Sequence, residues 1–254
     1  PSPSPTPDPY VPPHYEPTAD ELLPNDPDLW KAWGLLNYAQ KDSTNVVGTA
    51  GVDIDAPKAW KIGTGSKDIL IASIDTGVDY NHPDLADNIW INPGEIPDNG
   101  VDDDQNGFID DVRGWNFQGK NNDPMDDNEH GTHTAGTMGA KGNNGVGIAG
   151  VNWDVSIVPI KFLDKDGYGT LEDAVESIKY ATLIGVKIMN NSWGGGPFAQ
   201  ALYDVISEAK SKGILFVAAA GNERNNNDSS ASYPASYEID NIIAVAASDN
   251  QEKL

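Results

Sequence analysis

The sequence contains no cysteine. This absence excludes disulfide bonds, thiolate metal sites and cysteine nucleophiles together. It leaves an extracellular location open, because a domain of this length can be stable without disulfides and bound metal ions can replace them. Long apolar runs are absent too, since none reaches the roughly 18 residues that a membrane-spanning helix needs. We therefore expect no membrane span, and no signal peptide is recognisable.

Basic residues are scarce. The chain has 16 Lys and Arg against 39 Asp and Glu, which gives a formal net charge of −23. Because contacts to phosphate groups need a face of Lys and Arg, this balance argues against nucleic acid as a partner. The acids gather in two stretches, residues 97–111 and 121–129. Such local concentration indicates cation binding or a strongly solvated surface.

The sequence has enough apolar residues to build a core. Its hydrophobic content is 38%, with seven Trp and nine Tyr. Residues 1–24 differ, because they are rich in proline and begin "PSPSPTPDPYVPP". That composition predicts an extended linker. We expect the folded domain to span residues 25–254, with Trp30, Trp33 and Leu35 as its first apolar anchors.

Strand-like and helix-like segments alternate through the rest of the chain. Apolar runs predict strands at residues 68–75, 155–164, 186–193, 214–222 and 241–249. Helical patterns lie between them at residues 130–140, 170–185 and 198–213. This alternation predicts an α/β fold, a mostly parallel sheet with helices on both faces. Functional groups gather at the carboxyl ends of such strands, which here hold Asp75, residues 191–195 and Asn222.

Asp75 and His130 each admit more than one interpretation. Asp75 opens an Asp-Thr-Gly triplet, but an aspartic protease needs a second such triplet and none is present; an ordinary turn aspartate is the plain alternative. His130 and His133 lack the spacing and flanking glutamate of a His-Glu-x-x-His zinc motif. They are either a structural pair, or His130 is a general base whose other ring nitrogen is oriented by Asp75.

Asn222 follows an apolar strand and a glycine. An asparagine amide in that position can donate a hydrogen bond to a developing oxyanion. Alternatively, it is a turn residue that tolerates left-handed backbone geometry.

Five motifs in order resemble those of the subtilisin-like serine proteases. They are "IDTGVDYNHPDL", "HGTHTAGT", "NNSWGG", "AAAGN" and "YPASY". The resemblance runs from about Asn25 to the last residue. It implies a three-layer α/β fold, a secreted endopeptidase that works through an acyl-enzyme, protein or peptide substrates, and a propeptide or inhibitor as a further partner.

The resemblance also implies roles for individual residues. Asp75 would orient and stabilise His130, His130 would take and return the proton, and Asn222 would donate to the oxyanion. His133 would be structural. The residues implied in substrate binding form two strand edges and a pocket border: Ser192, Trp193 and Gly194; Gly167, Tyr168 and Gly169; Glu223 and Ser232.

The family's nucleophile sits in a Gly-Thr-Ser-Met-Ala motif, which this sequence lacks. Neither Ser66 nor Ser192 fits its place in the topology, and neither do the serines of the loop after Asn222. We expect the nucleophile to come from beyond residue 254, either because the chain is a truncation or because the protease is cut after Leu254 and its remainder stays docked as a second chain. The alternatives are a catalytically inactive binding module and a calcium-dependent structural protein.

The acidic stretch "DDDQNGFIDD" predicts a Ca²⁺ site. Asp102, Asp104 and Asn106 alternate and precede Gly107, as in the first half of an EF-hand loop. Arg113 stands where that loop needs its bidentate glutamate, so the site is not an EF-hand. Further candidate ligands are Asp110 and Asp111 in the same stretch and Asp98 just before it. The alternative is a solvated acidic loop.

Two more Ca²⁺ sites are expected. The resemblance implies one formed by Asp26, Asp84 and the loop of residues 141–148, with Asn144, Val146 and Ile148 as candidate ligands. Asp123 and Asp126 are candidates for a weaker third site. With no cysteine, bound cations would supply the stability that disulfides give elsewhere.

Overall fold

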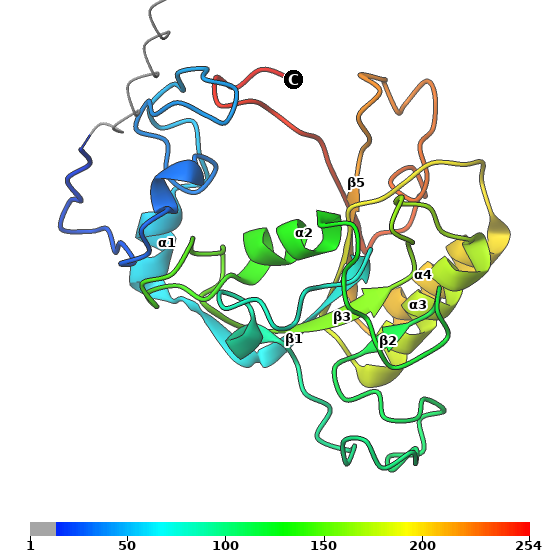
Figure 1. Cartoon of the computed structure of the whole chain (residues 1–254). Helices are drawn as coiled ribbons and strands as arrows, with labels where there is room; N and C mark the ends of the chain where they lie inside the picture. Colours follow the sequence, from blue (N-terminus) through cyan, green and yellow to red (C-terminus); the bar gives the residue numbers. More distant parts are fainter. Residues whose placement is uncertain (1–13) are drawn as a thin grey trace, which may run out of the picture.

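The computed structural model describes residues 14–254 and contains the predicted α/β fold (Figure 1). Six strands form one sheet in the order β2-β3-β1-β4-β5-β6, and every neighbouring pair is parallel. The strands are β1 (Gly65–Asp75), β2 (Trp115–Asn116), β3 (Asp154–Lys161), β4 (Ile188–Asn191), β5 (Leu215–Ala219) and β6 (Ile242–Val245). The helices are α1 (Ala56–Ile62), α2 (His130–Gly139), α3 (Leu171–Ile184) and α4 (Gln200–Ser211).

Helices cover both faces of the sheet. Alternate residues of a strand point to opposite faces, and β1 shows this clearly. Ala72 and Ile74 belong to the core that includes α3 and α4, whereas Ile71 packs in a second core with Ala135 of α2. The buried runs of the sequence are therefore two-sided strands, as predicted.

The predicted strands and helices are present, with shorter bounds in most cases. The strand predicted over residues 241–249, for example, ends at Val245. The seven-residue helix α1 and the two-residue strand β2 were not predicted. Both are too short to show a period in the sequence.

The N-terminal part of the described chain packs against the domain. Leu22 and Leu23 contact a third core cluster around Trp60 and Trp153, and the backbone N–H of Leu22 donates to the carbonyl of Pro57 at 2.9 Å. The first 13 residues of the predicted linker lie outside the described residues. The described part of that segment also contacts the domain at Tyr15, whose ring centroid lies 5.4 Å from that of Tyr38.

One sheet face is only partly covered. Helix α2 contacts β1 and β3, while β5 and β6 keep exposed apolar side chains: Leu215, Ile243 and Val245 are 42%, 48% and 49% exposed. After β6 the chain crosses to the N-terminal loops, where the backbone N–H of Thr49 donates to the carbonyl of Asn250 at 2.8 Å (Figure 1).

Candidate active site

The end of β1 and the start of α2 bring Asp75 and His130 into contact. Asp75 is the last residue of β1 and has no exposed surface, and His130 is the first residue of α2. The imidazole Nδ1 lies 2.7 Å from Asp75 Oδ1. The His130 side chain is 47% exposed, so the ring is reachable from solvent. The structure thus forms the carboxylate–imidazole pair that the sequence predicts.

The Asp75 carboxylate is held on several sides. Its Oδ1 also accepts from the backbone N–H of Thr76 at 2.7 Å, and its Oδ2 accepts from the Thr134 hydroxyl at 3.3 Å. Burial raises the pKa of Asp75, although the hydrogen bonds from His130, Thr76 and Thr134 oppose the shift. These contacts fix the orientation of the carboxylate against Nδ1 of the His130 ring.

The predicted substrate segments face one groove of about 470 Å³. Gly167, Tyr168 and Gly169 line it together with Trp193 and Gly194. Its other walls are mostly apolar, formed by Phe162, Leu163, Leu171, Ala174, Leu202 and Tyr233 among others. Ser192 is not part of this lining, and its hydroxyl accepts from Asn190 Nδ2 at 3.0 Å.

The groove is tied directly to the Asp75–His130 pair. The backbone N–H groups of Phe162 and Leu163 both donate to the carbonyl of Asp75, at 3.0 and 3.3 Å. Two residues that line the groove, Phe162 and Leu163, are therefore hydrogen-bonded directly to the last residue of β1.

Asn222, Glu223 and Ser232 gather near the end of β5. The backbone N–H of Asn222 donates to Glu223 Oε2 at 2.8 Å. A Cβ placed on Gly221 would lie 2.5 Å from Glu223 Oε2 and 3.7 Å from the Ser232 hydroxyl, and one on Gly194 would lie 3.9 Å from the same hydroxyl. The structure thus places the predicted pocket border beside the end of the "NNSWGG" segment, with Asn222 exposed to solvent.

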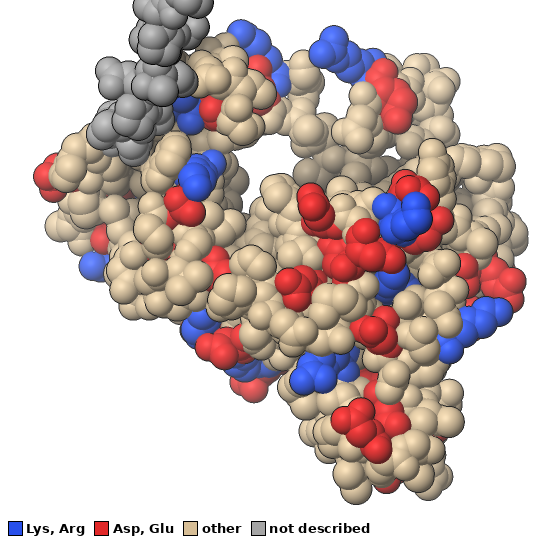
Figure 2. Space-filling view, viewed as in Figure 1, with Lys and Arg blue, Asp and Glu red and all other residues tan. Residues whose placement is uncertain are grey.

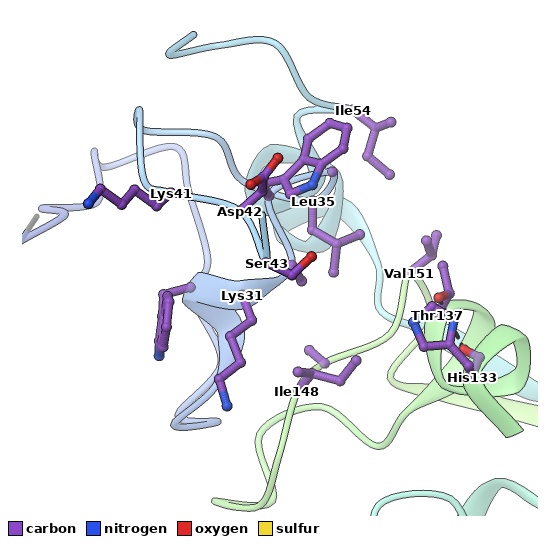
Figure 3. Close-up of a pocket in the computed structure, with 15 residues that line it drawn as sticks. Lys31, Leu35, Lys41, Asp42, Ser43, Ile54, His133, Thr137, Ile148 and Val151 are labelled. Carbon is purple, nitrogen blue, oxygen red and sulfur yellow. Dashed lines mark hydrogen bonds between the residues drawn. The ribbon is translucent and has the colours of Figure 1, made fainter. Parts of the chain in front are cut away.

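His133 faces another cavity. It lines, with Thr137 of α2, an apolar cavity of about 930 Å³ whose opposite wall is formed by the N-terminal loops. Figure 3 shows the two α2 residues on one side and Leu35 and Ile54 on the other. His133 and His130 therefore share no site.

Asp26, Asp84 and Asn144 come together as expected. The two carboxylates are 5% and 3% exposed. Asn144 Nδ2 donates to Asp84 Oδ1 at 2.7 Å, and the backbone N–H groups of Asn143 and Ile148 donate to Asp26 and Asp84. Within residues 14–254, neither carboxylate forms an ion pair with a basic side chain.

The acidic loop is arranged differently from the predicted ligand set. One carboxylate oxygen each from Glu95, Asp104 and Asp111 lie within 4.8 Å of one another. Figure 2 shows Asp and Glu side chains on the lobe that this loop forms. The carboxylate of Asp102 accepts from the N–H groups of Asn106 and Gly107, and that of Asp110 from Asn99 and Gly100. Asp98, with a φ of 60°, has no place in the cluster.

Glu95 was missed by the sequence reasoning, because it stands outside the alternating run of acids. Its carboxylate accepts from the N–H groups of Asp103, Asp104 and Asp110. Burial raises the pKa of Asp111, against hydrogen bonds from Tyr180, Asn92 and Asn106.

Asp123 and Asp126 have protein partners of their own. Asp123 Oδ1 accepts from the Tyr80 hydroxyl at 3.0 Å and from the N–H of Met125. Asp126 accepts from the start of α2 and from Thr76. The structure brings these two carboxylates into no shared acidic group among the described residues, so the third metal site finds no support in this geometry.

Comparison with known proteins agrees with these motifs. The subtilase family profile matches residues 66–254. The chain is 39% identical to the thermophilic serine proteinase of Bacillus sp. (strain AK1) and 38% identical to thermitase of Thermoactinomyces vulgaris, over 77% and 78% of its length. It is 30% identical to the minor extracellular protease Epr of Bacillus subtilis (strain 168) over 91% of its length. These alignments cover 42%, 61% and 33% of the three proteins.

Proposed function

Because the chain belongs to the subtilase family, we propose that it forms the part of a secreted serine endopeptidase that carries the general base, the substrate groove and the oxyanion donor. The observation that carries this proposal is the 2.7 Å contact between Asp75 and His130 at the carboxyl edge of the sheet. The extracellular Epr protease among the relatives supports secretion.

In this proposal His130 accepts the proton of a serine hydroxyl as that oxygen attacks the peptide carbonyl, and later gives the proton to the leaving amine. Asp75 holds the imidazole through Nδ1 and stabilises its charged form. The Asn222 amide donates to the oxyanion of the tetrahedral intermediate, and loss of such an asparagine donor costs about 3–4 kcal/mol of transition-state stabilisation in subtilisin.

The nucleophile is proposed to come from beyond residue 254, either in the same chain or in a separate one. No serine among residues 14–254 hydrogen-bonds to the His130 ring, whose partner is Asp75. The exposed apolar side chains of β5 and β6 offer a surface on which that segment would pack. Burying such a surface stabilises a complex at roughly 25 cal/mol per Å².

Substrate is proposed to lie extended in the groove between residues 167–169 and 193–194. Backbone from two facing segments can pair with an extended peptide on both sides, while pockets select its side chains. The apolar walls from Phe162, Leu163 and Leu171 favour an apolar side chain. A propeptide or protein inhibitor would use the same groove.

Calcium is proposed as the resident cation at two places. At the first place, Asp26 and Asp84 are nearly buried carboxylates that form no ion pair with a basic side chain among residues 14–254, and Asn144 lies beside them through the contact of its Nδ2 with Asp84. Carboxylate and amide oxygens are the ligands that Ca²⁺ prefers. At Glu95, Asp104 and Asp111, three carboxylates crowd within 4.8 Å. A bound Ca²⁺ would offset the repulsion of these charges, and the first site would fasten the N-terminal segment to the domain.

A fluorophosphonate probe, which phosphonylates activated serines, tests the proposal. We expect the purified protease to take up one probe per molecule, on a serine that maps outside residues 1–254. His130→Ala should abolish labelling, because the serine then has no base. His133→Ala is the matched control, and it should keep the label because His133 faces a different cavity.

Two results would contradict the proposal. A label on a serine within residues 1–254 would show that the nucleophile lies in this part of the chain. A folded protein that takes up no label would instead be a catalytically inactive binding module or a structural protein. Measuring whether an apolar peptide still binds the groove separates that binding module from a calcium-dependent structural protein.

A further inference from the structure

A hydroxyl group links the residues that follow Asp75 and His130. Thr76 comes directly after Asp75, and Gly131 comes directly after His130. The backbone N–H of Gly131 donates to the Thr76 hydroxyl at 2.9 Å, and this hydroxyl donates to Asp126 Oδ1 at 2.8 Å. The end of β1 and the start of α2 are therefore joined beside the carboxylate–imidazole contact as well as through it.

Asp126 fixes the other side of this link. Its Oδ2 accepts from the backbone N–H and the hydroxyl of Thr132, at 2.8 and 2.6 Å, and its Oδ1 also accepts from the N–H of Asn128 at 2.9 Å. Burial alone would raise the pKa of Asp126, but the hydrogen bonds from Thr132, Asn128 and Thr76 outweigh it, so the pKa is lowered. The carboxylate stays ionised and accepts from both elements at once.

We propose that Thr76 and Asp126 are positioning residues that set the distance and angle between Asp75 and His130. A helix cap alone would need only the contacts of Asp126 to Asn128 and Thr132. The hydrogen bond from the Thr76 hydroxyl to Asp126, 50 residues further along the chain, connects this cap to the end of β1 as well. The inference rests on the proposed function, in which His130 is the base.

The charged groups around His130 come from three places. Asp75 ends β1, and Lys161 is its register partner at the end of β3. The loop that leads into α2 adds Asp126, Asp127 and Glu129. Among the described residues, Asp75 is the hydrogen-bond partner of the His130 ring, so a change in that one contact should dominate any shift of the His130 pKa.

NMR titration of the four histidines in residues 1–254 tests the inference. Thr76→Val keeps the shape of the side chain but removes the hydroxyl. We expect it to loosen the hydrogen bond from His130 to Asp75 and so lower the His130 pKa by about half a unit or more. Thr76→Ser should restore the wild-type value. His14, His82 and His133 serve as internal references.

Thr137→Val is the matched control, because its hydroxyl on α2 bonds to the carbonyl of His133 and not to β1. It should leave the His130 pKa unchanged. A folded Thr76→Val variant with a wild-type His130 pKa would overturn the inference, as would an equal shift in Thr137→Val. If Thr76→Val does not fold, Asp126→Glu moves the carboxylate by one methylene and gives the same readout.

The two proposals fail separately. Absence of probe labelling would refute the protease function and leave the titration result standing. An unmoved His130 pKa in a variant that still labels would refute only the positioning role.

Discussion

Gly131 controls how closely α2 approaches β1. A Cβ on this residue would lie 2.0 Å from the carbonyl oxygen of Gly77 and 3.1 Å from Asp75 Cβ. We expect Gly131→Ala to push α2 away from the strand end, because a backbone carbonyl cannot yield as a flexible side chain does. The change should lower the free energy of unfolding and lengthen the contact between Asp75 and His130. Chemical denaturation measures the first effect and the His130 pKa the second.

Gly136→Ala on the same helix is the control. A Cβ there would meet nothing within 4 Å. Replacing a helical glycine by alanine stabilises a protein by roughly 0.5–1 kcal/mol where space allows. The prediction is wrong if both variants gain stability, since the close approach would then cost nothing.

At the scale of elements, Lys161 joins three segments around the site. It is 3% exposed at the end of β3. Its ammonium donates to the carbonyls of Thr76 and Leu163, at 2.7 and 2.8 Å, and to Asp127 Oδ1 at 2.6 Å. These acceptors lie after β1, after β3 and just before α2. One side chain thus connects the ends of the elements that carry Asp75 and His130.

Lys161→Met should be strongly destabilising, because it leaves the two carbonyls and Asp127 without their donor. Removing one partner of a buried pair costs about 3–5 kcal/mol, and we expect the lower end because Asp127 is 54% exposed. Lys165→Met is the control, since Lys165 and its partner Asp166 are 68% and 61% exposed. Urea denaturation of the two variants compares them, and equal losses would show that the Lys161 contacts contribute little.

The sequence predicted the elements better than their fine contacts. The buried strand over residues 68–75 and the helix over residues 170–185 have long, clear apolar patterns, and both are present. Their order along the chain was enough to place Asp75, residues 191–195 and Asn222 at one sheet edge. Glu95 and Thr76 carry no such signal, because their partners depend on loop conformation and on contacts between distant segments.

At the scale of the molecule, we expect stability to depend on cations, because the chain has 39 acidic residues against 16 basic ones. Two effects are combined. General repulsion among surface charges is screened by any salt. In the proposed calcium site, the nearly buried carboxylates of Asp26 and Asp84 would need a specific ligand, because monovalent ions at bulk concentration do not replace an oxygen-coordinated Ca²⁺.

Chelation should therefore lower the melting temperature in a way that NaCl only partly restores. A site filled at 100 times its dissociation constant adds about 2.7 kcal/mol. For a chain of this size that corresponds to about 5–10 °C. Thermal unfolding in EGTA, followed by addition of Ca²⁺, Mg²⁺ or NaCl at matched ionic strength, measures the two parts separately.

Asp84→Asn assigns the specific part to its site. This variant should keep the response to NaCl and lose a large share of the response to Ca²⁺, the remainder coming from Glu95, Asp104 and Asp111. Asp87→Asn, a change at an exposed neighbour outside the site, should behave like the wild type. If Mg²⁺ and NaCl restore stability as fully as Ca²⁺, only charge screening is at work, and neither acidic group holds a calcium ion.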